Sequence, residues 1–137
     1  MLSGSCLCGE VKFEVTGPLP PLQFCHCADC RKAQGTAFAA NVPVATADIT
    51  WLSGQDQLCI YKSSPGKERV FCPTCGSPIL SRRPDTPGVV RLRAGILNPP
   101  TNLTPGFHFY TADKADWWEI EGDLVQYPGE KPKDIAE

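Results

Sequence analysis

Seven of the eight cysteines in this chain fall into clusters whose spacing suits metal binding. The clusters are two close pairs and one triplet: Cys6 with Cys8, Cys72 with Cys75, and Cys25 with Cys27 and Cys30. Thiolates two or three residues apart can share one ion, and zinc prefers four tetrahedral ligands. The two pairs together therefore predict a closed structural zinc site. In the second pair, Pro73 stiffens the turn and Gly76 is free to adopt a positive φ.

The triplet predicts a different kind of site, because three thiolates leave one position of a zinc ion open. Catalytic zinc sites combine three protein ligands with a water or a substrate molecule, whereas structural sites are filled. Cys25, Cys27 and Cys30 are therefore the candidate reaction site. His26 and Asp29 could supply a fourth ligand, but His26 lies between two ligands, so we expect its ring to face solvent.

Other interpretations of the cysteines are open at this stage. The two pairs could be separate buried or redox-active pairs, although no thioredoxin-like βαβ pattern accompanies them. A disulfide framework would suit a shorter, secreted chain. Cys59 has no partner at ligand spacing, so we expect it to be a core or strand residue.

Several basic residues are close in sequence to the cysteine clusters: Arg31, Lys32, Lys67, Arg69, Arg82 and Arg83. Zinc sites built from three or four thiolates carry net negative charge, so cations are expected nearby. A thiol substrate with carboxylates would find a metal for its sulfur and cations for its acid groups. We expect Arg31 and Arg69 to bind those carboxylates.

Length and charge restrict the class of protein. The chain has 137 residues and a formal net charge of −2, so we predict one domain over residues 1–137. No basic run is longer than Arg82-Arg83, which argues against a nucleic-acid partner. No apolar run is long enough for a membrane span, and the start does not look like a signal peptide. We therefore expect a cytoplasmic protein without a membrane partner.

Composition favours short strands, because fourteen prolines and twelve glycines interrupt every candidate helix. Strands are predicted at residues 11–15, 22–24, 38–42, 49–52, 57–61, 68–71, 78–82, 89–93 and 107–110, arranged as a meander. Residues 25–34 have room for one or two helical turns, closed by Gly35 as a C-cap. The tail after Tyr127 is polar and predicted to be loose. The sequence thus predicts a mostly β fold.

The motifs, taken in order, resemble the family of glutathione-dependent formaldehyde-activating enzymes and the related centromere protein V. The matching segments are Gly-Ser-Cys-Leu-Cys-Gly at 4–9, Cys-His-Cys-x-x-Cys-Arg-Lys at 25–32, Arg-Val-Phe-Cys-x-x-Cys-Gly-Ser at 69–77, and Ala-Gly-Ile-Leu at 94–97. Gly35, Tyr61, Ser63, Ser64, His108, Tyr110, Lys114, Trp117 and Asp123 follow the pattern too, so the similarity covers nearly the whole chain. Asn98 departs from it, because the family usually has Asp there, and no acid role is transferred to that position.

The resemblance implies a β-tent fold of short antiparallel strands with zinc knuckles. It implies two zinc ions per chain: a structural one on Cys6, Cys8, Cys72 and Cys75, and a catalytic one, which could be labile, on Cys25, Cys27 and Cys30. It also implies a carbon-sulfur lyase type of reaction, in which a thiol such as glutathione adds to formaldehyde. A zinc-bound thiol loses its proton near neutral pH and is held as a nucleophile. Arg31 or Ser63 could bind the oxygen of the aldehyde.

Two other functions remain open. A zinc-stapled binding module would use the triplet as a second structural site, filled by water, by His26 or by a neighbouring chain. A redox or metal-buffering protein would use the triplet as reactive thiolates. The oligomeric state cannot be inferred from these residues.

Overall fold

Short strands dominate the computed structural model, which describes residues 1–133. The strands are β1 (Leu2–Ser5), β2 (Lys12–Val15), β3 (Leu22–Cys25), β4 (Ala39–Ala45), β5 (Ile49–Ser53), β6 (Cys59–Ser64), β7 (Lys67–Phe71), β8 (Pro78–Arg82), β9 (Val89–Arg93), β10 (Pro105–Phe109) and β11 (Val125–Gln126). The α-helix α1 spans Ala28–Gln34, and 3₁₀ turns lie at Thr46–Asp48, Gln55–Gln57, Ala94–Ile96 and Thr111–Asp113.

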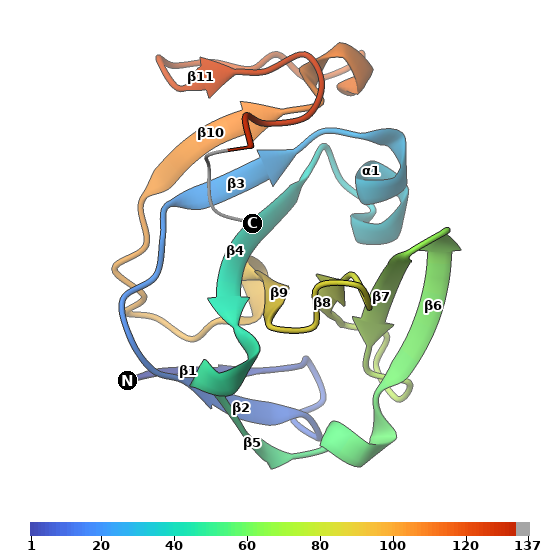
Figure 1. The fold of residues 1–137 in the computed structure, drawn as a ribbon, viewed down its shortest axis with the longest axis vertical. Coiled ribbons are helices and arrows are strands. Elements are labelled where there is room, and N and C mark those ends of the chain that lie inside the picture. Colours follow the sequence, from blue (N-terminus) through green and yellow to red (C-terminus); the bar gives the residue numbers. More distant parts are fainter. Residues whose placement is uncertain (134–137) are drawn as a thin grey trace.

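The strands form a three-stranded sheet, β1-β2-β5, and an eight-stranded sheet in the order β11-β10-β3-β4-β9-β8-β7-β6. Strands β6 to β9 pair in sequence as an antiparallel meander. The meander then ends, because β9 pairs with β4, and β10 runs parallel to β3 and β11. In Figure 1, α1 lies between strand β3 and the strands β6 and β7. The predicted mostly β fold of short antiparallel strands is confirmed, with two parallel pairs in addition.

One face of the large sheet is apolar and packs into the core. Cross-strand partners on this face come from four strands in one row: Val42, Leu92, Leu80 and Val70. All four are buried and share a cluster with Val11, Phe13 and Val15 of the small-sheet region. This row is the product of period-two alternation, which places every second side chain of a strand on the same face. The core therefore lies between the two sheets.

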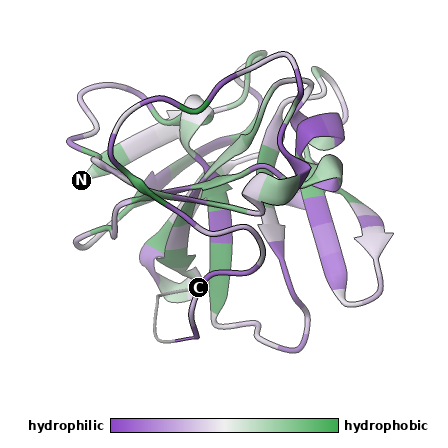
Figure 2. Cartoon of the chain, turned by 90° about the horizontal axis from the view of Figure 1, so that it is seen from above, coloured by the Kyte–Doolittle hydropathy of each residue, from purple (hydrophilic) through white to green (hydrophobic). Residues whose placement is uncertain are grey.

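The opposite face of the same strands carries polar groups. Asn41 is paired with Arg93, and Arg91 is paired with Ser81, which in turn is paired with Arg69. Asn41, Ser81, Arg91 and Arg93 are buried all the same. Figure 2 shows this alternation as purple and green segments that succeed one another along the strands. The large sheet thus presents buried cations on the face away from the core.

The helix and its cap follow the sequence prediction. Cys27 is the N-cap of α1, and its Sγ accepts a hydrogen bond from the backbone N–H of Cys30 at 3.3 Å. Gly35 ends the helix with φ of 66°, and its N–H donates to the carbonyl of Arg31. A left-handed C-cap of this kind favours glycine. The N-cap ties two of the three clustered cysteines to one short element.

Two short strands and the C-terminal segment differ from the predictions. Strands β1 and β11 were not predicted, because Leu2–Ser5 is half polar and Val125–Gln126 has only two residues. The tail after Tyr127 was predicted to be loose, and for residues 128–131 this is wrong. Gly129 accepts a hydrogen bond from the N–H of Tyr110 at 2.9 Å, and Lys131 is buried with its Nζ 5.1 Å from the centre of the Phe109 ring. Residues 134–137 lie outside the described part.

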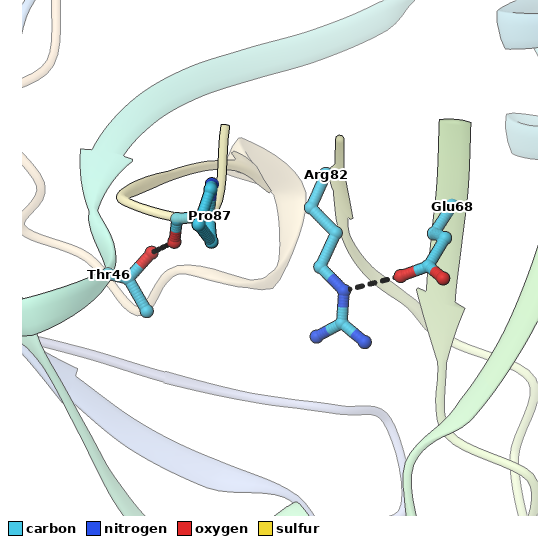
Figure 3. A network of polar contacts seen from close by, with 4 residues as sticks. All are labelled: Thr46, Glu68, Arg82 and Pro87. Atoms are coloured by element: carbon cyan, nitrogen blue, oxygen red, sulfur yellow. Dashed lines mark hydrogen bonds and ion pairs between the residues drawn. The ribbon is translucent and has the colours of Figure 1, made fainter. Parts of the chain in front are cut away.

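Polar contacts also join the ends of the central strands (Figure 3). Thr46 donates from Oγ1 to the carbonyl of Pro87 at 2.7 Å, and Nε of Arg82 donates to Oε1 of Glu68 at 2.8 Å. The first contact connects the end of β4 to the turn between β8 and β9. The second forms an ion pair between β8 and β7. Arg82 is thus engaged away from the polar face of the sheet.

Candidate active site

Two loops bring four cysteine sulfur atoms together. The loop after β1 carries Cys6 and Cys8, and the loop from β7 to β8 carries Cys72 and Cys75. All four Sγ atoms lie within 4.8 Å of one another, with 3.5 Å between Cys6 and Cys8 and 3.8 Å between Cys8 and Cys72. A disulfide would need about 2 Å, whereas thiolates about 2.3 Å from a tetrahedral zinc are about 3.8 Å apart. The arrangement fits one four-thiolate metal site.

Backbone hydrogen bonds give each loop the shape that turns its sulfurs inward. Gly9 and Gly76 adopt φ of 84° and 79°, and each donates its N–H to the carbonyl of the first cysteine in its own loop. Such positive φ values favour glycine. The two loops are also joined directly, because the N–H of Leu7 donates to Oγ of Ser77 at 2.9 Å. The four-cysteine site therefore fastens the start of the chain to the middle of the large sheet.

The cysteine triplet is formed where β3 leads into α1. Cys25 ends the strand, Cys27 caps the helix and Cys30 lies in its first turn, with the three Sγ atoms within 4.8 Å of one another. The backbone N–H of His26 donates to the carbonyl of Phe109 at 3.0 Å, which fixes the turn to β10. Within residues 1–133, no fourth His, Cys, Asp or Glu joins the three sulfurs. The triplet therefore offers three ligands to a metal.

His26 corrects the expectation of a solvent-facing ring, because its side chain is fully buried. Its ring points away from the sulfurs and into an aromatic cluster with Phe38, Trp118 and His108. Burial first, and then the charges of His108 and Lys114, lower the pKa of His26 to about 4. Because successive side chains alternate along the turn, the ring of His26 lies on the opposite side from the two neighbouring cysteines. That side is protein interior and not solvent.

A cavity of about 280 Å³ opens beside the triplet and includes all three cysteines in its wall. Five cationic side chains line it: Lys67, Arg69, Arg83, Arg91 and Lys131. Its acidic lining consists of Asp29 and Glu130. Glu130 accepts a hydrogen bond from the hydroxyl of Tyr110 at 3.3 Å and lies 3.6 Å from Nζ of Lys131. The cavity is thus suited to a ligand that carries negative charge.

Arg69 reaches the triplet directly. Its Nη1 and Nη2 atoms donate to Sγ of Cys30 at 3.8 and 3.7 Å, and its Nε donates to Oγ of Ser63 at 3.0 Å. Arg31 instead donates from Nε to the carbonyl of Asp113 at 3.2 Å. Neither Arg31 nor Ser63 is among the residues that line the cavity. Of the sequence-predicted substrate-binding residues, the structure therefore brings Arg69 to the cavity.

The thiols of the triplet differ in acidity. Hydrogen bonds with Cys25 and Cys27 first, and then the charges of Arg69 and Arg93, lower the pKa of Cys30. Hydrogen bonds with its two partners, followed by burial, raise the pKa of Cys25. Cys30 is consequently the first of the three to become a thiolate.

Sequence reasoning did not find Arg91, Arg93, Lys131 or Tyr110 as site residues. They come from β9 and from the segments that follow β10, which are distant in sequence from every cysteine cluster. One signal was available for the first two. Arginines at alternate positions of the predicted strand 89–93 must share a face, and that face cannot be the apolar one.

All eight cysteines are free in the structure, so the disulfide framework is not formed. Cys59 lies half-buried in β6, which agrees with the expected strand position, and it joins neither cluster. Asn98 donates from Nδ2 to Oγ of Ser3 at 3.1 Å and does not line the cavity. Among residues 1–133, no helix has the length and apolar character to cross a membrane.

Comparison with known proteins places these features in one group. The pattern of the family described as "Glutathione-dependent formaldehyde-activating enzyme" matches residues 1–113. A Halomonas elongata protein whose name places it in that group is 36% identical, over 88% of this chain and 82% of its own. An uncharacterized lyase of Schizosaccharomyces pombe is 25% identical, over 85% of this chain and 83% of its own. The crystal structure of a Rhodobacter sphaeroides protein superposes with a TM-score of 0.59 at 26% identity, covering 75% of this chain and 97% of that one.

Proposed function

The chain belongs to the family of glutathione-dependent formaldehyde-activating enzymes, and from this premise we propose that it is a zinc-dependent enzyme of the carbon-sulfur lyase type. It would add a thiol, glutathione or a similar one, to formaldehyde or another small aldehyde, and cleave the same adduct. The observation that carries the proposal is the triplet of Cys25, Cys27 and Cys30 in the wall of a cationic cavity.

The donor atoms of both clusters fit zinc. Sulfur atoms within 4.8 Å of one another, unbridged and partly buried, are what a thiolate-bound zinc requires. We propose a structural zinc on Cys6, Cys8, Cys72 and Cys75, and a second zinc on Cys25, Cys27 and Cys30. When bound, the second zinc would supply Lewis acidity that keeps a substrate thiol deprotonated. Eight unbridged cysteines also agree with a reducing compartment such as the cytoplasm.

The side chains around the cavity have separable roles in this proposal. The acid groups of the thiol are bound by Lys67, Arg83 and Lys131. These three cationic side chains line the cavity and make no short contact with the sulfurs of the triplet. Burial first, and then four neighbouring arginines, lower the pKa of Lys67 to about 8. At neutral pH its ammonium can therefore hold a carboxylate, or give a proton to the oxygen of the forming adduct.

The triplet geometry favours an enzyme over a zinc-stapled binding module. As a second structural site the triplet would be filled by water, by His26 or by a neighbouring chain, and the ring of His26 is turned into the aromatic cluster instead. In the described part of the chain the three sulfurs stand without a fourth donor group. A position left free for substrate is the form that catalytic zinc sites take.

The test is to mix the protein with glutathione and formaldehyde and to follow adduct exchange by NMR. We expect the wild-type protein to accelerate exchange over the uncatalysed reaction, and Cys30→Ser to lose the acceleration. Cys59→Ser is the matched control, since Cys59 belongs to neither cluster. Exchange at the uncatalysed rate in the wild-type protein would reject the formaldehyde reaction.

A further inference from the structure

The guanidinium of Arg69 is committed to a cysteine of the triplet. Two of its N–H groups point at Sγ of Cys30, and its third contact, to Oγ of Ser63, holds the group in that orientation. A guanidinium has a rigid planar set of donors, so fixing Nε also fixes both terminal nitrogens. Arg69 is therefore placed to act on the metal site through its sulfur ligand.

Arg93 is a second arginine on the polar face of the large sheet. Arg93 is buried on the same face of the sheet, and it donates to Oδ1 of Asn41. Its Nε has no hydrogen-bond partner, and within residues 1–133 neither Arg93 nor Arg69 forms an ion pair with a carboxylate. A buried guanidinium needs a counter-charge. Among the described residues, Cys30 as a thiolate is the negative group that both arginines face, and Arg93 also interacts with Cys25.

The charge balance of the two clusters differs as a result. Three thiolates and a divalent metal sum to one negative charge, and the two arginines more than offset it. At the four-cysteine site, by contrast, the described partners outside the cluster are neutral: the N–H of Val11 donates to Sγ of Cys6, and Sγ of Cys75 donates to Oγ of Ser77. Hydrogen bonds to a ligating sulfur also reduce the charge that it donates to the metal. An additional ligand at the triplet is thus favoured when it brings a negative charge.

We propose that Arg69, supported by Arg93, is a positioning residue that makes the open coordination position at the triplet select anionic ligands over neutral ones. The class of ligand is a thiolate or another small soft anion, and the acid groups of a larger ligand are left to Lys67, Arg83 and Lys131. The inference rests on the metal occupancy in the proposed function and does not depend on formaldehyde as the second substrate. It also changes the expected role of Arg69, from holding a substrate carboxylate to holding a cysteine.

The test uses the full chain reloaded with Co²⁺ and two probes, thiocyanate as the anion and imidazole, above its own pKa, as the neutral ligand. Binding of each probe at the open position alters the visible absorption of cobalt, whereas the filled four-cysteine site contributes a constant background. We expect Arg69→Gln to lower thiocyanate affinity about tenfold or more, because a nearby charge is lost, and to leave imidazole affinity unchanged or raised. Arg69→Lys should restore part of the anion preference.

Arg82→Gln is the matched control, because Arg82 belongs to the neighbouring strand and is paired with Glu68. It should leave both affinities unchanged. An equal loss of affinity for thiocyanate and imidazole in Arg69→Gln would overturn the proposal, and so would an unchanged affinity for both. Where Arg69→Gln does not load cobalt at the triplet, Arg69→Lys and Ser63→Ala decide: a reduced thiocyanate-to-imidazole ratio supports it and an unchanged ratio rejects it. Lack of glutathione and formaldehyde turnover in the wild-type protein would reject the proposed reaction alone, since the cobalt ratio is measured without either substrate.

Discussion

Nε2 of His26 lies 2.8 Å from Nδ1 of His108, and the two buried rings join the cysteine triplet to strand β10. Phe24 stacks on His108, and Phe38 packs against both imidazoles. Burial lowers the pKa of His108, and burial above all lowers that of His26, so both rings are neutral near pH 7. The pair thus supports the turn between two metal-ligand candidates without adding charge to it.

Replacing His108 with Phe should destabilise the protein by about 1–3 kcal/mol, because Nε2 of His26 would be left buried without its partner. His108→Asn should cost less, since an amide can still reach the ring nitrogen. Thermal melting measures the loss of stability. Metal analysis should show that the zinc of the triplet is bound more weakly and is lost before the zinc of the four-cysteine site. An equal melting temperature for His108→Phe and the wild-type protein would show that the pair does not support this turn.

The two cysteine pairs and the triplet were predictable because each of them is local in sequence. A turn that places two sulfurs on one ion needs only a few residues, so spacing and trailing glycines predicted the knuckles before any tertiary contact was known. The burial of His26 could not be predicted in the same way. It depends on Trp118 and His108, which reach the turn only through the parallel pairing of β10 with β3.

The cationic residues of the cavity wall could not all be predicted from the sequence, for the same reason. Closeness in sequence suggested Arg31 and Arg69 equally, yet the helix turns Arg31 toward Asp113 while β7 turns Arg69 toward Cys30. Lys131 reaches the cavity because the segment after β11 folds back over Phe109. Such placements result from long-range packing, which residue types at a given spacing do not encode.

Removal of one ligand from the four-cysteine site should unfold the protein. Cys8→Ala leaves three sulfurs where four hold the loop after β1 to the loop before β8, and the binding energy of such a zinc is part of the folding energy. We expect insoluble protein or loss of a cooperative melt. Cys59→Ala, a half-buried cysteine outside both clusters, is the control. A soluble Cys8→Ala protein with a cooperative transition would contradict the structural role.

Metal analysis of the freshly purified protein should find about two zinc ions per chain. A mild chelator should remove one of them first, because the triplet supplies three protein ligands and opens to a cavity, whereas the other site has four. Circular dichroism should change little until the second ion is lost. Simultaneous loss of both ions with unfolding would show that the two sites are not separable.

The pH dependence of thiol binding should report Lys67. Burial and neighbouring arginines lower its pKa to about 8. The amine is therefore protonated and positively charged below that pH, and it loses the charge as the pH rises through about 8. The charges of Arg69, Arg83, Arg91 and Arg93 act on it, and Asp29, Glu130 and Lys131 line the same cavity.

We therefore expect KM for glutathione to rise above about pH 8, while kcat follows a separate profile. Lys67→Arg keeps the positive charge at every accessible pH, so it should abolish that rise. Lys67→Met should give a raised KM that is the same on both sides of pH 8. The measurement is KM against pH for the three proteins, with a thiol that lacks carboxylates as the control substrate. If KM still rises above about pH 8 in Lys67→Arg, the titration belongs to another group, and Lys67 does not bind the acid groups of the thiol.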